Sequence, residues 1–310
     1  MAEVTQFVFF DFEMLCSEKG MTFESMEAIR LGAVKYNIKT GQITTFDQYI
    51  KPKSNQSLSS FCKELTGIDD AHLKKASSFK VVFEDFLTWV GGVKKSRFFS
   101  WSPSDISRLR IDAAEHSIPD GTITKINKRY VDFQAIFSKR VSKTNASVES
   151  ALRMYGLPFI GEKHNPMYDS YNTLRIYLNF LNEPIESDLL MLKHFIFDDE
   201  AYSVTRINQH LTEKINHDLS TLIGERDVFH MKDARKMLKR TRNLVNKYNN
   251  ILINRSGLFS KENMSLVDKL TSFYHEFLGC FEEHHSYSSK VIILDDFAVK
   301  RVSHLQLKQG

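Results

Sequence analysis

The order of strand and helix signals in the first 182 residues restricts the fold more than any other feature of the sequence. Three strand-like segments rich in β-branched and aromatic residues come first, at 6–12, 28–38 and 43–50. The short turn signal Thr40-Gly41 makes the second and third antiparallel neighbours. Strands and helices then alternate, which favours an α/β fold with a parallel or mixed sheet covered by helices, in a strand order that the pattern leaves open. The later elements are expected as helices at 58–65, 79–90, 104–116, 148–155 and from Pro166 onward, with short strands at 98–101 and 130–133.

The remainder of the chain is predicted to be a second, mainly α-helical domain. A length of 310 residues suggests about two domains. Pro184 would end the helix before it, so the domains are placed at 1–182 and 183–310. The apolar share of 42% and charged share of 26% exclude collagen-like, coiled-coil and wholly disordered chains.

Apolar runs and cysteine spacing predict a reduced, cytoplasmic protein without a membrane partner. The longest apolar runs, 7–10 and 291–294, are far shorter than the roughly 20 residues of a membrane span. The N-terminus lacks the basic region and cleavage site of a signal peptide. Cys16, Cys62 and Cys280 are too widely spaced for a disulfide framework or a Cys-x-x-Cys metal pair. The net charge of +4 permits a nucleic-acid partner without requiring one.

Two carboxylates, Asp11 and Glu13, stand at the end of the first predicted strand. Side chains alternate along a strand, so both point to one face and Phe12 points to the other. Carboxylates placed in this way repel each other unless cations lie between them, and their oxygens suit Mg²⁺ or Mn²⁺. A polar strand end that faces water is the alternative interpretation.

Two further acids and a histidine stand at predicted helix starts. Asp169 falls in the first turn of the helix that Asn165-Pro166 would begin, where the helix dipole alone would explain an acid. His164 lies just outside this helix, where a neutral imidazole could take a proton from water, although most of the 11 histidines should be surface residues. Asp105 follows a predicted buried strand, and capping of the next helix would explain it equally well.

The five side chains together indicate more than any of them alone. They occur in the order Asp11, Glu13, Asp105, His164 and Asp169, each at the end of a predicted strand or helix. Two-metal hydrolysis of a phosphodiester needs several carboxylates that hold two ions about 3.5–4 Å apart, one to activate water and one to stabilise the leaving oxygen.

At these residues the chain resembles the DEDDh-type 3′–5′ exonucleases of the ribonuclease-H-like superfamily. Within them it is similar to the branch of Eri-type RNA 3′ exonucleases and bacterial KapD sporulation-inhibitor-like proteins, over about residues 5–180. The motifs that carry the resemblance are Asp11-Phe-Glu followed by Cys16, the segment Phe61-Cys-Lys-Glu-Leu-Thr-Gly-Ile68, Trp101 with Asp105, and His164 with Asp169-x-x-Asn172.

The resemblance implies a fold and a role for each motif residue. The fold would be a ribonuclease-H-like mixed sheet with three antiparallel strands and two parallel additions. The four acids would hold two Mg²⁺ or Mn²⁺ ions, and His164 would be the general base. Met14-Leu15, where the branch usually has Ala-Thr, affects the shape of the pocket rather than the metal set. The residues implied beside the 3′-terminal nucleotide are Phe12, Met14, Thr66, Gly67, Ile68 and Trp101.

A basic window stands out in the second domain. Residues 183–310 contain 18 basic and 18 acidic residues, yet seven of those basic residues lie within 232–247, against one acid. This stretch is either a surface that follows the phosphates of a substrate or a solvated helix face. His284-His285 are predicted to be surface residues. The candidate phosphate contacts are Arg235, Lys236, Lys239, Arg240 and Arg242.

The sequence therefore favours a metal-dependent 3′–5′ exonuclease that acts on RNA or on short single-stranded 3′ ends. One alternative is a catalytically idle binding or regulatory protein, similar to the KapD-like regulators, with a protein partner on 183–310. Another is a DNA-directed proofreading or repair exonuclease, since the choice between RNA and DNA depends on contacts to the 2′-OH.

Overall fold

The computed structural model describes residues 3–54, 56–198, 203–222 and 228–293, and the chain divides into two compact units. Unit 1 comprises Met1–Lys139 and Thr144–Asn182, and unit 2 comprises Arg140–Lys143 and Glu183–Gly310. Four residues of the first predicted domain thus belong to the second unit. Arg140 is one of them, and its guanidinium donates a hydrogen bond of 2.7 Å to the side chain of Asn250, which also lies in unit 2.

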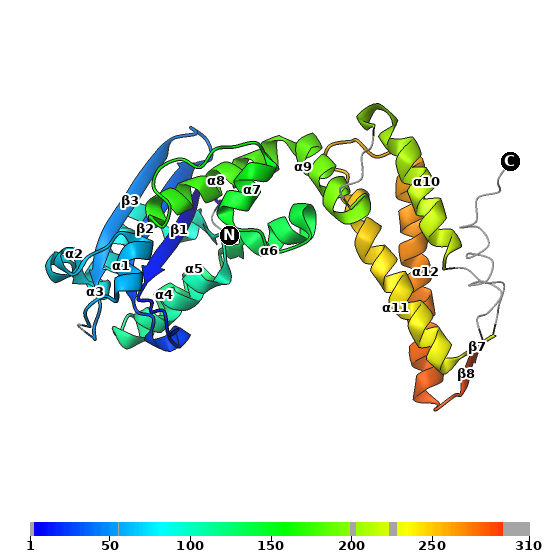
Figure 1. The fold of residues 1–310 in the computed structure, drawn as a ribbon, viewed down its shortest axis with the longest axis horizontal. Coiled ribbons are helices and arrows are strands. Elements are labelled where there is room, and N and C mark those ends of the chain that lie inside the picture. The colour runs from blue at the N-terminus through cyan, green and yellow to red at the C-terminus, as the bar shows by residue number, and fades with distance from the viewer. Residues whose placement is uncertain (1–2, 55, 199–202, 223–227, 294–310) are drawn as a thin grey trace. The chain divides into compact units, whose positions relative to one another are not determined.

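Unit 1 is built on a mixed six-stranded sheet (Figure 1). The strand order is β4-β3-β2-β1-β5-β6, in which β1, β2 and β3 are antiparallel neighbours, while β5 and β6 add in parallel beside β1. This confirms the implied ribonuclease-H-like arrangement and adds a two-residue strand beside β3. The strands are β1 (Gln6–Met14), β2 (Ala28–Asn37), β3 (Ile43–Lys51), β4 (Ser77–Ser78), β5 (Ser96–Ser100) and β6 (Tyr130–Asp132).

One face of the sheet carries the larger core of unit 1. Val8, Phe10 and Phe12 alternate along β1 and are buried against apolar residues of α3, α4 and α5. Every second residue of β1 is thus buried on this face, as the alternation of side chains along a strand predicts. The helices packed there are α3 (Phe79–Val90), α4 (Pro103–Glu115) and α5 (Asp120–Asn127).

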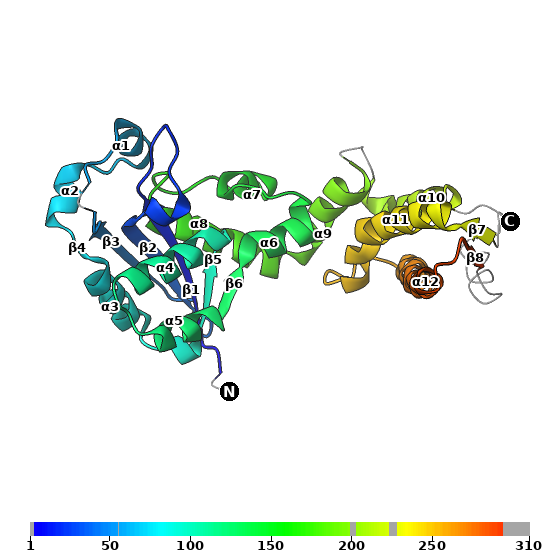
Figure 2. The same ribbon diagram turned by 90° about the horizontal axis from the view of Figure 1, so that it is seen from below.

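The opposite face of β1 packs against a long helix, α8 (Pro166–Asn182) (Figure 2). Phe7 and Phe9 contact the ring of Tyr177 on this helix, with centroids 5.3 and 5.5 Å apart. Asp11 and Glu13 continue the same row of side chains toward the end of β1. The strand therefore directs both carboxylates to the face that α8 covers.

Helix ends in unit 1 follow local signals. Gly67 and Gly91 end α1 and α3 in the left-handed conformation that favours glycine, with φ of 68° and 72°. Helix α1 begins two residues later than predicted, because the Ser59 side chain caps it by accepting the N–H of Cys62. The remaining elements are α1 (Ser60–Thr66), α2 (Asp70–Lys75), α6 (Phe133–Phe137), α7 (Val148–Met154), 3₁₀ turns at Phe23–Ser25 and Val93–Lys95, and a π-helix, Ser138–Ser142, that crosses into unit 2.

Unit 2 is mainly helical, as predicted, and has a hydrophobic core of its own. Ile215, Tyr248, Leu270 and Phe277 are fully buried within it. The predicted late strand at 291–294 is described as far as residue 293, and residue 294 lies outside the described part of the chain. The elements are α9 (Pro184–Met191), a π-helix at Leu192–Ile196, α10 (Ile207–Ser220), α11 (Met231–Tyr248), α12 (Lys261–Ser286), an antiparallel pair of β7 (Val228–His230) with β8 (Val291–Ile293), and 3₁₀ turns at Val204–Arg206 and Asn249–Ile253.

Within the residues that the structure describes, no helix combines the length and the apolar character that crossing a membrane would need.

Candidate active site

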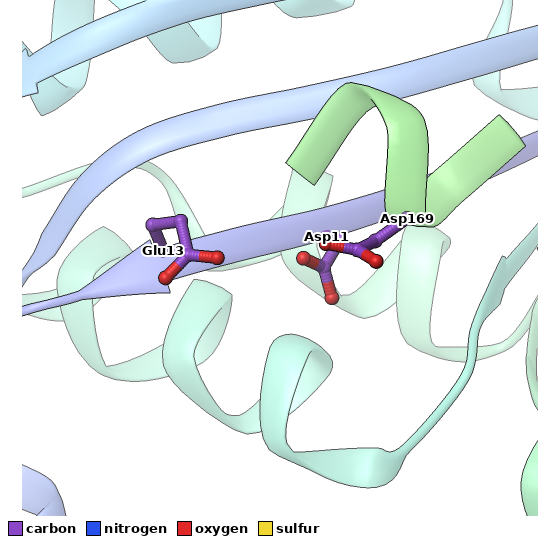
Figure 3. Close-up of side chains that lie close together, drawn as sticks. All are labelled: Asp11, Glu13 and Asp169. Atoms are coloured by element: carbon purple, nitrogen blue, oxygen red, sulfur yellow. The ribbon is translucent and has the colours of Figure 1, made fainter. Parts of the chain in front are cut away.

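Three acidic side chains meet where β1 ends beside the first turn of α8. Asp11 and Glu13 come from β1 and Asp169 from α8 (Figure 3). Each offers one carboxylate oxygen, and these three oxygens all lie within 4.8 Å of one another. A set of oxygen ligands at this spacing matches the preference of Mg²⁺ and Mn²⁺.

Gly32 lets α8 approach the sheet at this point. It pairs with Asp11 in the register of β1 and β2. A Cβ atom built on Gly32 would lie 2.0 Å from the main-chain nitrogen of Met167, so any other residue would push the helix away. The Ser170 hydroxyl donates a hydrogen bond of 3.2 Å to the Gly32 carbonyl and holds the helix there. Glycine is therefore needed at this position to bring Asp169 to Asp11.

The pKa values of the three carboxyl groups are raised, so their charged forms are unfavourable when no cation is bound. Burial raises the pKa of Asp11 well above its usual range, and repulsion from Asp105 and Asp169 adds to the shift. Burial also raises the pKa of Glu13 to about 8, although the nearby Arg30 guanidinium opposes the shift. The pKa of Asp169 rises to about 7, mainly through burial. Divalent cations would relieve this repulsion, so the residues present fit a metal site.

Asp105 lies beside these carboxylates, and it is not the helix cap that was the alternative interpretation. The N-cap of α4 is Ser102, whose side chain accepts the N–H of Ser104. Asp105 is buried instead and accepts the main-chain N–H of Phe12 at 3.2 Å. Burial raises the pKa of Asp105 to about 6, although its interactions with the Phe12 N–H and the Asp11 carboxyl group oppose the rise. The helix-cap alternative for Asp105 is therefore wrong.

His164 lies next to the cluster, on the loop that enters α8. It has a left-handed backbone with φ of 59°, and its main-chain N–H opposes the rise in the pKa of Asp169 that burial causes. The side chain is exposed, and the contacts recorded for the described residues include no hydrogen bond from the imidazole. The Asn165 side chain accepts the N–H of Met167 at 3.2 Å, which is the predicted capping of α8.

The His164 loop is tied to α8 by one buried amide, that of Asn172. Its Nδ2 donates to the carbonyls of Ile160 and Tyr168, both at 2.9 Å, and its Oδ1 accepts the Ile160 N–H at 3.2 Å. Arg175 adds a hydrogen bond of 2.6 Å to the Pro158 carbonyl. Asn172 thereby fixes the segment that carries the predicted base.

The residues implied beside the 3′-terminal nucleotide lie at the end of α1, on β1 and directly after β5. Thr66 and Ile68 are buried, and the Thr66 hydroxyl donates to the Cys62 carbonyl at 2.7 Å. Gly67 between them is exposed, and a Cβ built there would meet nothing within 4 Å. Phe12 is buried in the core.

Two of the residues predicted to bind substrate make contacts within unit 1, and the predicted phosphate contacts lie in unit 2. The Met14 carbonyl accepts from the Cys62 thiol at 3.7 Å. The Trp101 indole is buried and donates to the Ala146 carbonyl at 2.9 Å, so its ring is committed to the core. The five candidate phosphate contacts, in contrast, are all exposed on α11 of unit 2.

Two neighbours of the cluster escaped the sequence analysis, Gly32 and Arg30. Arg30 lies opposite Glu13 in the strand register and forms two hydrogen bonds with Asp47, of 2.8 and 2.7 Å. The signal that could have found both is the pairing of β1 with β2, which needs the register as well as the existence of the strands.

A mixed sheet with half-buried, clustered carboxylates beside a helix N-terminus matches the site expected of a ribonuclease-H-like nuclease. The comparison with known families agrees. The exonuclease family of the RNase T type matches residues 8–177, which is more than half of the chain. The protein therefore belongs to this family of DEDDh-type 3′–5′ exonucleases.

Curated relatives and solved structures place the chain beside Eri-type enzymes. It is 26% identical over 186 residues to ERI1 exoribonuclease 2 of Homo sapiens, which covers 53% of this chain and 26% of the relative. It is 28% identical over 187 residues to 3′-5′ exoribonuclease 1 of Homo sapiens, covering 57% and 52%. The nuclease domain of 3′hExo, a DEDDh family member bound to rAMP, shares the fold with a TM-score of 0.53 at 24% identity, over 60% of this chain and 97% of that one. The chain thus spans between about a quarter and about half of these curated relatives.

Proposed function

We propose that this protein is a metal-dependent 3′–5′ exonuclease that removes nucleotides from the 3′ end of RNA or short single-stranded nucleic acid. The observation that carries the proposal is the cluster of half-buried carboxylates where β1 ends beside α8, whose mutual repulsion calls for cations. A binding protein without catalysis would have no use for such a group. The idle, KapD-like alternative is therefore less well supported, and it stays a prediction.

In the proposed site, Asp11, Glu13, Asp105 and Asp169 would hold two Mg²⁺ or Mn²⁺ ions. When bound, the ions would activate water and stabilise the leaving oxygen of the phosphodiester. The carboxylates must be ionised to bind them, and the main-chain N–H groups of Phe12 and His164 favour the charged forms of Asp105 and Asp169.

His164 is proposed as the general base. Its side chain is exposed, so an attacking water could reach it. The Asn172 amide holds the loop that carries it, through hydrogen bonds to Ile160. The loop is thus in place before the substrate arrives.

The preference for RNA rests on the relatives. Two of them are named as exoribonucleases, and one solved structure of this fold describes 3′-end specific recognition of a histone mRNA stem-loop. Exposed Gly67, with open space above it, is the point where we expect the main chain of the Thr66–Ile68 turn to approach the terminal nucleotide.

The test is a time course of the purified protein on RNA and DNA oligonucleotides labelled at either end, with Mn²⁺ or with EDTA. We expect stepwise, metal-dependent loss from the 3′ end, faster on RNA. Asp11→Asn should abolish it, while Asp120→Asn, a change of an exposed acid on α5, should leave it intact. Degradation by the Asp11→Asn protein, or none by the folded wild type, would contradict the proposal.

A further inference from the structure

Helix α11 has two opposite faces of very different character. Ala234, Thr241, Val245 and Tyr248 are buried in the core of unit 2. A helix turns by about 100° per residue, so six basic residues fall within an arc of about 160° on the other side. This basic face of α11 consists of Lys232, Arg235, Lys236, Lys239, Arg240 and Arg242, all of them exposed.

Neighbouring carboxylates do little to neutralise the basic face. Lys247, the seventh basic residue of the window, pairs with Asp218 at 2.7 Å and belongs to the internal structure of the unit. Lys236 lies 3.4 Å from Asp233, but both side chains are more than half exposed, and such pairs contribute little.

The other five cations of the face have no acidic partner among the described residues. The Arg235 guanidinium lies over the ring of Phe281, 5.9 Å from its centroid, which orients it without neutralising it. For Lys232, Lys239, Arg240 and Arg242, the ion pairs of the described residues include no carboxylate.

Such a concentration of charge is unfavourable for the isolated unit. Lys232 with Lys236, and Lys236 with Arg240, are like charges at i,i+4, which destabilise a helix. The six residues extend along about 15 Å of helix. Because residues 183–310 contain equal numbers of acidic and basic residues, the positive charge is a local feature rather than a property of the whole domain.

We propose that the basic face of α11 binds the phosphate backbone of a single-stranded nucleic acid. The inference rests on the proposed exonuclease function for the class of that ligand. The burial of the apolar face decides between this occupant and a lipid surface. A membrane-binding or groove-binding amphipathic helix inserts its apolar face, and in α11 that face is already in the core. Only the exposed basic side chains of α11 remain available for binding, and they suit a polyanion.

The test is binding of the full-length protein to a fluorescent oligouridylate of about 30 nucleotides, long enough for several phosphate contacts, followed by anisotropy over a range of salt concentrations. EDTA is present throughout, so the strand is not cleaved. The variant is Lys239→Gln/Arg240→Gln/Arg242→Gln, which preserves helix propensity. The matched control, Arg206→Gln/Lys261→Gln/Lys269→Gln, removes equal charge from exposed residues of the same unit outside α11.

We expect the α11 variant to bind at least about tenfold more weakly. The slope of log affinity against log salt should become shallower by about 2, from about 0.7 per lost contact on a single strand. The control should match the wild type. Equal slopes for all three proteins would overturn the inference, and so would a variant that loses binding to phosphatidylserine vesicles but keeps its affinity for RNA. Binding in EDTA needs no catalysis, so failure of the exonuclease assay would leave this result interpretable.

Discussion

At the scale of single residues, the position that decides the geometry of the site carries no side chain. Gly32 faces Asp11 across the strand register, and the backbone of α8 occupies the space where a Cβ would be. The carboxylate of Asp169 reaches the cluster only because this space is free. The carboxylates of the cluster come from β1 and α8, whereas the glycine that lets them meet comes from β2.

Gly32→Ala should harm both stability and activity. The added methyl group overlaps backbone atoms, which cannot rotate away, so we expect a loss of about 1–3 kcal/mol in the free energy of unfolding. A displacement of Asp169 by about 1 Å should lower kcat about 100-fold. Gly121→Ala is the control, since a Cβ there meets nothing within 4 Å. Urea unfolding and nuclease kinetics measure both effects, and an active, stable Gly32→Ala protein would refute the proposed close approach.

The raised carboxylate pKa values predict how the metal-free protein responds to pH. An acid whose folded pKa lies above its unfolded value keeps its proton longer in the folded state, so stability is lost as pH rises through the folded pKa. For Glu13 this window runs from its ordinary 4.5 to about 8. In EDTA, Tm should fall between pH 5 and pH 8, as measured by thermal unfolding. Glu13→Gln should flatten the fall, whereas Glu64→Gln, a change of an exposed acid on α1, should not.

At the scale of elements, the loop between α7 and α8 is held by side chains that lie beyond it in the sequence. Asn172 is fully buried, and its amide binds both the N–H and the carbonyl of Ile160. Removing the amide would free this part of the loop from α8. The loop would then no longer define where His164 lies.

Asn172→Ala should therefore lower kcat more than the affinity of the site for Mn²⁺. The carboxylates stay in place, and the base loses its position. Asn179→Ala is a matched control on the same helix, where the amide makes one hydrogen bond of 3.0 Å to the Arg175 carbonyl. Nuclease kinetics and Mn²⁺ titration separate the two effects, and equal kcat values in both variants would argue against a positioning role.

The elements also show where prediction from sequence ends. Three strands, the helices closed by Gly67 and Gly91, and the alternation that directs Asp11 and Glu13 to one face all follow from local pattern. The strand order needed pairing information that no local pattern holds. Asp105 was ambiguous for the same reason, because a helix cap and a contact with the Phe12 N–H look alike in sequence.

At the scale of the whole molecule, two compact units share one chain, and each has hydrophobic packing of its own. The metal site is assigned to unit 1 and the basic face of α11 to unit 2. The boundary predicted near Pro184 leaves Arg140–Lys143 in the first domain, whereas these residues lie in unit 2, where the Arg140 side chain is hydrogen-bonded to Asn250. Such a contact between residues 110 positions apart has no signature in composition or periodicity.

Two cores predict two thermal transitions, of which only one responds to metal. Ligand binding stabilises the unit that holds the site, by about 2.7 kcal/mol when the free ligand is 100 times Kd. Calorimetry with added Mn²⁺ should raise the Tm of the unit 1 transition alone, and Asp11→Asn should remove that shift. A single transition that moves as a whole would show that the two units unfold as one.

Because the acids at the end of β1 are half-buried and lie so close together, some of them carry protons at neutral pH when no metal is bound. Groups with a pKa near 7 or 8 are partly protonated at neutral pH, so loading the site exchanges hydrogen ions for metal ions. In weak buffer the protein should acidify the solution as it takes up Mn²⁺, and the apparent heat of binding should vary with the ionisation enthalpy of the buffer. The enzyme would then be filled more readily in a mildly alkaline compartment than in an acidic one, whatever the supply of metal.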